Sequence, residues 1–118
     1  MRENLSIGER AEIVTDMIRL TESGELWWEA SGGPSSFRSR RGGAVAIIER
    51  MDASQRVRLR FQAVDDGAGD DVVIDIAHPA EDEPKDIKAL YSILDKLWRV
   101  TERLAVPNAA DLFLRGNS

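Results

Sequence analysis

The short connections between the apolar runs in the middle of the chain constrain its fold more than any other feature. Five runs, several rich in β-branched or aromatic residues, are bounded by turn-forming residues and predict consecutive β-strands at 26–30, 37–41, 44–50, 57–63 and 72–77. A connection between parallel strands needs about a dozen residues or more, and the segments between these runs are shorter. We therefore expect an antiparallel meander, in which Gly42-Gly43 forms either a tight turn or a bulge.

Helical patterns flank these strands on both sides. Ser6 and Glu9 have the spacing of a capping box, which predicts a helix from about residue 7 to residue 23, ended by Gly24 in a left-handed conformation. A second helix is predicted from about 84 to 104, where apolar residues recur at spacings of three and four. The apolar stripes of the two helices should form the core with the sheet, and their central members are Val14, Met17, Leu90, Leu94, Leu97 and Trp98.

These elements predict an α+β domain with two layers. An antiparallel sheet of four to five strands should carry the N-terminal and the C-terminal helix on one face. The 118 residues suffice for one packed core and not for two, so residues 1–118 are expected to form a single domain. The segment 107–114 contains Leu112, Phe113 and Leu114 and is expected to dock on that core.

Cysteine and long apolar runs are both missing from the sequence. Without cysteine, the chain has no disulfide, no thiolate metal ligand and no cysteine nucleophile. The first ten residues lack the apolar region of a signal peptide, and no apolar run approaches the roughly 18 residues of a membrane-spanning helix. We therefore expect a cytoplasmic protein that makes no membrane contact.

Residue types that form catalytic and metal sites are scarce. His78 is the single histidine and has no second histidine or cysteine with which to share a metal ion. No phosphate-binding glycine loop or nucleophile motif is present. The acidic segment 65–71 lacks the spacing of an EF-hand calcium loop, so a hairpin loop is the simpler interpretation. We therefore expect a protein that is not an enzyme, with no catalytic residues, no cofactor and no metal.

Arginines concentrate in the predicted sheet. Residues 36–60 contain seven arginines against two acidic residues, although the formal net charge of the whole chain is −5. Arg58 and Arg60 alternate with apolar residues and should point away from the helices, where Arg38 and Arg40 could join them. Such a surface could bind an anion or a nucleic acid. The favoured alternative is cross-strand pairing, for which Asp75 is correctly phased.

Two adjacent tryptophans point to an interface. Trp27 and Trp28 fall in one predicted strand, so their side chains should project to opposite faces, and only one of them can easily enter the core. The other could be covered by the segment 107–114 or serve as an interface anchor. The run 44–50 is apolar on both faces, and it adds Ala44, Ala46 and Ile48 to the candidate interface.

The run Leu20-Thr21-Glu22-Ser23-Gly24-Glu25-Leu26-Trp27-Trp28, followed by a meander and by Leu90-Tyr91, resembles a group of small uncharacterised bacterial α+β proteins. In that group, a helix ending in a Leu-Thr, Gly, Leu, Trp pattern precedes a sheet. The resemblance implies the same order of elements and carries no activity, cofactor or site residue with it.

Three functions are compatible with the sequence. The leading hypothesis is a non-catalytic protein-interaction module that self-associates, as a homodimer for example, through the outer sheet face or an edge strand. The alternative is an acidic inhibitor or immunity-type protein that binds a basic toxin or nuclease through carboxylates such as Glu81, Asp82 and Glu83. Nucleic-acid or anion binding through the arginines ranks third, because aromatic and glycine residues do not interleave with them.

Overall fold

The described part of the chain runs through a helix, five strands and a second helix. The computed structural model describes residues 5–31, 35–51, 55–63 and 70–105. Its elements are α1 (Ile7–Glu22), β1 (Glu29–Ala30), β2 (Ser36–Arg41), β3 (Ala44–Met51), β4 (Arg56–Ala63), β5 (Asp70–Ala77) and α2 (Lys85–Leu104). The predicted α+β class is confirmed. The predicted docking segment 107–114 lies outside the described residues.

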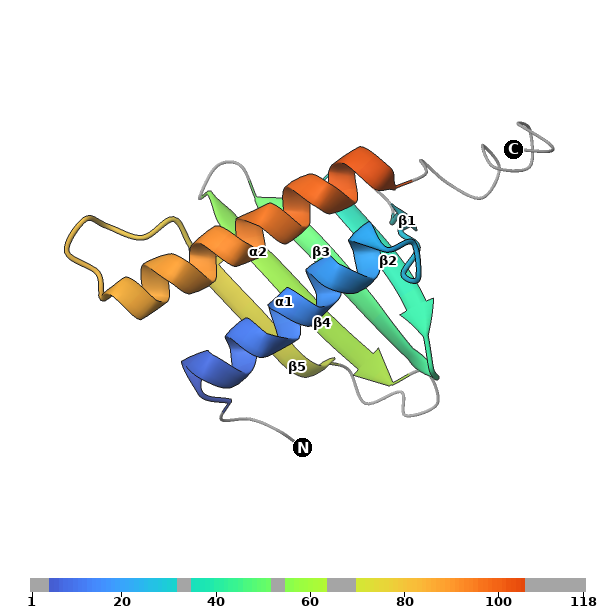
Figure 1. The fold of residues 1–118 in the computed structure, drawn as a ribbon, viewed down its shortest axis with the longest axis horizontal. Coiled ribbons are helices and arrows are strands. Elements are labelled where there is room, and N and C mark those ends of the chain that lie inside the picture. The colour runs from blue at the N-terminus through green and yellow to red at the C-terminus, as the bar shows by residue number, and fades with distance from the viewer. Residues whose placement is uncertain (1–4, 32–34, 52–54, 64–69, 106–118) are drawn as a thin grey trace.

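The five strands form one antiparallel sheet in the order β1-β2-β3-β4-β5, so the predicted meander is confirmed (Figure 1). The connection between β2 and β3 is a two-residue turn. Gly42 and Gly43 both have positive φ, 60° and 77°, and the flanking Arg41 and Ala44 are ladder partners. Two left-handed residues in succession give the turn that matches the twist of a hairpin, so the tight-turn alternative holds and the bulge does not.

Capping side chains set the ends of α1. The Ser6 hydroxyl accepts a hydrogen bond from the Glu9 amide at 3.0 Å, and the Glu9 carboxylate accepts one from the Ser6 amide at 2.9 Å. This is the predicted capping box. At the other end, Gly24 adopts a φ of 85°, and the amide of Leu26 donates to the carbonyl of Leu20. Both ends of the helix therefore follow the sequence signals.

The end of α1 also shortens the first strand. The sequence predicts a strand at 26–30, whereas β1 contains only Glu29 and Ala30. The amide of Leu26 bonds to Leu20 in the turn that closes the helix, so it is not free to join the sheet ladder. The sheet therefore has a two-residue strand at this edge.

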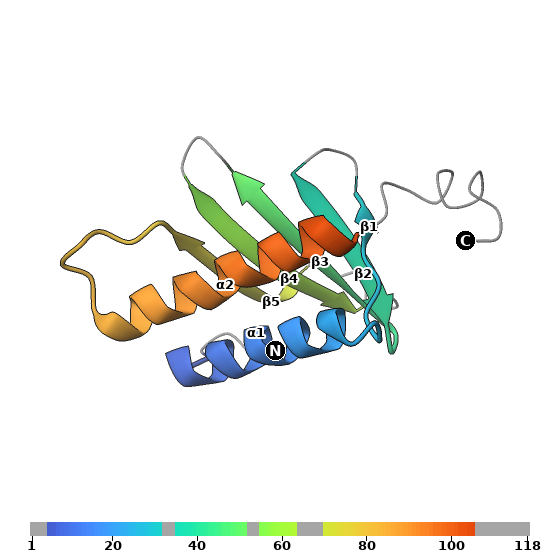
Figure 2. The ribbon, with the colours of Figure 1, turned by 45° about the horizontal axis from the view of Figure 1, so that its top comes forward.

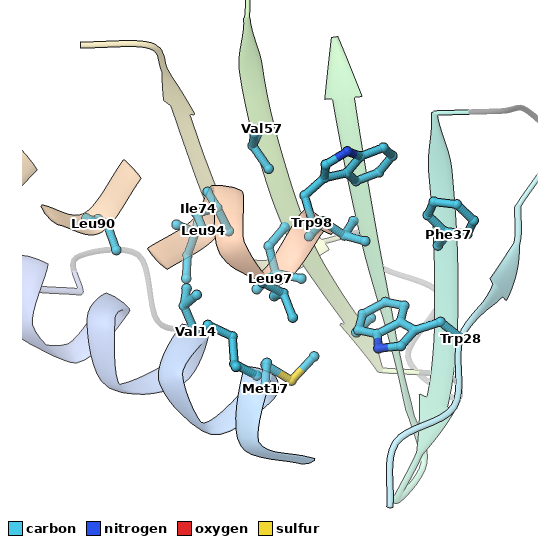
Figure 3. Close-up of a cluster of buried hydrophobic side chains, with 14 of the residues drawn as sticks. Val14, Met17, Trp28, Phe37, Val57, Ile74, Leu90, Leu94, Leu97 and Trp98 are labelled. Carbon is cyan, nitrogen blue, oxygen red and sulfur yellow. The ribbon is translucent and has the colours of Figure 1, made fainter. Parts of the chain in front are cut away.

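Both helices lie on the same face of the sheet and side by side, which gives two layers (Figure 2). The core lies between the layers (Figure 3). Leu94 and Leu97 of α2 and Val14 of α1 are fully buried there, and Trp98 packs its ring against Phe37 of β2, with the ring centroids 5.3 Å apart. All six core residues predicted from the helical stripes are buried.

Candidate functional site

The sheet face opposite the helices, called the outer face below, has a different character from the core. The register places alternate side chains of each strand on it, and those of the central rows are Glu29, Arg38, Arg40, Val45, Ile47, Glu49, Arg58, Arg60, Val73 and Asp75. Five arginines including Arg56 and three carboxylates share this face. Charged groups on adjacent strands of one face are close enough to pair, so their partners decide what the face can bind.

An ion-pair network occupies the β3, β4 and β5 part of the outer face. The Asp75 carboxylate lies 2.9 Å from the Arg56 guanidinium and 3.1 Å from that of Arg58. The Glu49 carboxylate lies 3.3 Å from Arg60 and 4.0 Å from Arg58. Cross-strand pairing is therefore the observed state of Arg58 and Arg60, as the favoured alternative stated, and it leaves them poorly placed as anion-binding groups.

Two members of this network were not singled out from the sequence. Arg56 is in phase with Arg58 and Arg60 two and four residues later, which is a signal that strand alternation provides. Glu49 becomes a partner only through the register between β3 and β4, which places it directly opposite Arg58. Register depends on turn geometry as well as on the residue pattern, so the sequence alone does not predict this pair.

Arg38 and Arg40 differ from the other arginines of the face. Both lie on β2 with exposed side chains, and neither has an ion pair among the residues that the structure describes. They border a hollow of about 300 Å³ near the β1 edge of the sheet, and the lining residues are Trp27, Glu29, Arg38, Ser39, Arg40 and Val45. The predicted four-arginine site is thus divided, with one pair engaged in the network and the other pair free.

The two tryptophans project to opposite sides, as their adjacency predicts. Trp28 is 2% exposed and its indole N–H donates to the Thr21 hydroxyl at 3.0 Å, while that hydroxyl donates to the Met17 carbonyl at 2.7 Å. Trp27 is 60% exposed and lines the hollow on the outer face. Trp28 therefore belongs to the core, and Trp27 is the tryptophan available to a partner.

The candidate interface derived from β3 needs a correction. Ala46 and Ile48 are 7% and 0% exposed and lie in the core under the helices, as Trp28 does. Ala44 shares their phase and is half-buried. The outer face instead carries Val45 and Ile47, because the strand register assigns alternate residues to opposite faces. β3 is apolar on both faces, as predicted. The prediction that Ala44, Ala46 and Ile48 are the accessible set was wrong.

The acidic residues Glu81, Asp82 and Glu83 lie in the turn between β5 and α2, and all three are exposed. The Lys88 ammonium donates a hydrogen bond to the Glu81 carbonyl oxygen, which ties the turn to the first part of α2. The turn stands apart from the hollow at the β1 edge, because β5 is the opposite edge strand. Contact with a basic partner stays a prediction for these three residues.

A group of polar side chains borders the core beside α2. Tyr91 is mostly buried, and its hydroxyl donates to the Gln55 carbonyl at 3.3 Å. Burial raises the pKa of the Tyr91 phenol above its ordinary value of 10.0, and the nearby carboxylate of Asp95 raises it further. His78 packs edge-on against the Tyr91 ring, with centroids 5.2 Å apart. His78 is thus in contact with Tyr91, and its structural role stays a prediction.

The opposite edge of the sheet is a long strand. β5 pairs with β4 on one side only, and among the described residues no strand pairs with its other side. Its outward-facing Val73 is 42% exposed, which makes it one of the few large apolar side chains so exposed among the described residues. Val73 was not predicted from the sequence as an exposed edge residue, although the last strand of a meander must lie at an edge.

A scan of protein-family models and searches of curated proteins and of solved structures found no match to this chain. Within the described residues, no three acidic, histidine or cysteine side chains group closely enough to hold a metal ion. In the same part of the chain, neither helix has the length and apolar character needed to cross a bilayer.

Proposed function

We propose that this protein is a non-catalytic, cytoplasmic protein-interaction module that forms a homodimer by pairing β5 with β5 of a second copy. The observation that carries the proposal is the contrast between the two edges of the sheet. The β1 edge has only two residues, whereas β5 has eight, with one side of its backbone unpaired within the described part of the chain. A long, unprotected edge is a template for another strand.

The side chains of β5 favour this pairing. Proteins that keep an edge strand free commonly place prolines or outward-facing charges on it. No proline lies in β5. Its charged residues are Asp70 and Asp71 at the start of the strand and Asp75, which is held by two arginines of the neighbouring strand. Some apolar side chains that pack against the core are only partly buried. They include Ile7 and Ala11 near the start of α1, and Val72 and Ile76 in β5.

A second copy fits this edge with one specific register. An antiparallel two-fold pair centred on Ile74 would place Ile74 opposite its symmetry mate, Val72 opposite Ile76, and Val73 opposite Asp75. Residues directly opposite in such a pair share a face, so the apolar residues meet on the helix-covered side and no like charges meet among these five. By contrast, stacking two outer faces would bury the ion-pair network, which costs free energy of desolvation.

Sedimentation velocity over a range of micromolar concentrations tests the dimer. We expect a concentration-dependent monomer–dimer equilibrium. In the proposed register, Val73→Glu sets a carboxylate opposite Asp75 of the second copy and should shift the protein to monomer. Within one copy, Arg60 is the direct cross-strand neighbour of residue 73, so this glutamate should not destabilise the monomer fold.

The matched controls are Val73→Thr, which keeps the β-branched shape, and Val73→Gln, which has the size of glutamate without its charge. Both should still dimerise. A wild-type protein that stays monomeric throughout would refute the proposal, and a Val73→Glu variant that dimerises like the wild type would refute the register.

A further inference from the structure

We propose that the hollow beside Trp27 binds a small ligand that combines a planar aromatic ring with one anionic group, such as a carboxylate or a phosphate monoester. This site lies at the β1 edge and is independent of the proposed self-association through β5. Its volume of about 300 Å³ is at the lower end of the range for small-molecule sites. A single aromatic ring with a short anionic substituent suits that size.

The aromatic part of the ligand is inferred from Trp27. This side chain is 60% exposed, whereas Trp28 and Trp98 are 2% and 3% exposed in the core. An indole is a large, flat apolar surface, and a ligand that covers it removes apolar area from water. A planar ring can stack on it, and Val45 supplies a further apolar contact from β3 in the same hollow.

The anionic part is inferred from the arginines. Arg38 and Arg40 are the exposed cations of the hollow, and neither pairs with a carboxylate among the described residues. Arg56, Arg58 and Arg60 show the alternative, since each of them has a carboxylate within 4.0 Å. A guanidinium group without a partner is suited to a bidentate contact with a carboxylate or phosphate.

Glu29 limits the charge of the ligand. Its carboxylate also lines the hollow, and its backbone partner across the strands is Arg38. The lining therefore has one positive charge in excess, so a carboxylate with its single negative charge fits it better than a phosphate monoester, whose charge near pH 7 is about −1.5 to −2. Arg40 is paired in the ladder with Val45 and is farther along β2 from Glu29, so we assign it the main anion contact.

Nuclear magnetic resonance titration of the isotope-labelled protein tests the site. The three tryptophans give three indole N–H signals, and a Trp27→Phe variant identifies the one from Trp27. The probes are benzoate and phenyl phosphate, which carry the ring with a carboxylate or with a phosphate. Saturable shifts of the Trp27 signal with either probe support the proposal, and the stronger probe identifies which anion the site prefers.

Control probes separate the two parts of the ligand. Phenol without phosphate and inorganic phosphate without a ring should each bind much more weakly than phenyl phosphate. Arg40→Ala should weaken binding by about tenfold or more, as expected for the loss of a charge-assisted hydrogen bond. Arg103→Ala, which removes an exposed cation from the last turn of α2, should change nothing.

Several results would overturn the site. One is that neither probe gives saturable shifts of the Trp27 signal, whether or not a single-stranded oligonucleotide binds. The others are that inorganic phosphate alone binds as tightly as the phosphate probe, or that Arg40→Ala binds the probes as tightly as the wild type. The monomeric Val73→Glu variant should bind the probes as the wild type does. Failure of the dimer and failure of the ligand site are therefore distinguishable.

Discussion

The two faces of the sheet are built from the same five strands and hold the molecule together in different ways. On the helix-covered face, Ile48, Leu59 and Ile74 are almost completely buried with the leucines of α2. On the outer face, the same strands present partly exposed ion pairs. Apolar burial contributes about 25 cal/mol per Å², whereas partly exposed ion pairs contribute little. Stability should therefore come from one face, which leaves the other free to change.

The substitution with the largest expected effect is Leu94→Ala on the helix-covered face. Leu94 is 0% exposed, so the substitution removes apolar contacts and leaves a cavity. We expect a loss of about 2 to 5 kcal/mol in the free energy of unfolding. Urea unfolding measures it. Lys96→Ala on the exposed side of the same helix should change stability by no more than about 0.5 kcal/mol. Equal midpoints for the two variants would show that the buried face of α2 has been misassigned.

A smaller effect is expected from the buried polar contact on the same face. Thr21→Val removes the hydroxyl that accepts the Trp28 indole hydrogen, and it leaves that donor buried without a partner. The expected loss is about 1 to 3 kcal/mol. A double-mutant cycle with Trp28→Phe isolates the hydrogen bond, because the Thr21 change should cost less once the donor is gone. Strictly additive effects would contradict this role of Thr21.

On the outer face, Asp75→Asn should have a still smaller effect. The substitution keeps the shape of the side chain and removes the charge that Arg56 and Arg58 share. Because these groups are partly exposed, we expect a loss of about 1 kcal/mol or less, which shrinks further at high salt. Urea unfolding at low and high ionic strength measures both. A loss in the free energy of unfolding as large as that of Leu94→Ala would show that both faces contribute strongly to stability.

The smallest effect concerns the rim of the core and is confined to alkaline pH. Tyr91 is the single tyrosine, so phenolate absorbance reports its ionisation alone. Its pKa is raised in the fold, chiefly by burial and then by Asp95. The unfolded chain should therefore ionise first, and stability should be lost as the pH rises above about 10. Absorbance titrations with and without urea compare the midpoints, and a folded midpoint at or below the unfolded one would contradict the shift.

The sequence predicted the fold better than the surface. Helix ends were readable because Ser6, Glu9 and Gly24 act through bonds to residues close in the chain. The meander was readable because its connections are short. Which residue of each pair, Val45 or Ala46 and Trp27 or Trp28, becomes buried depends on the phase of the chain relative to the helices. Alternation identifies the two sets of residues and does not say which set is covered.

The candidate site depended on contacts between strands. Asp75 could be phased with the arginines from the sequence, but the division of those arginines into paired and unpaired groups required the register with Glu49. The hollow beside Trp27 joins β1, β2 and β3, and Trp27 precedes β1 because this strand begins at Glu29 and not at the predicted residue 26. No local pattern encodes a hollow formed by three strands.

The position of α2 has a consequence for how the chain is synthesised. The sheet forms from neighbouring segments, and each strand can pair as soon as the next one exists. Its helix-facing surface, however, is closed by Leu90, Leu94 and Leu97, which follow all five strands in the chain. Until α2 has emerged from the ribosome, the nascent chain exposes the apolar side of the sheet beside α1. Its exposure to chaperones and to aggregation should therefore be greatest just before α2 is complete.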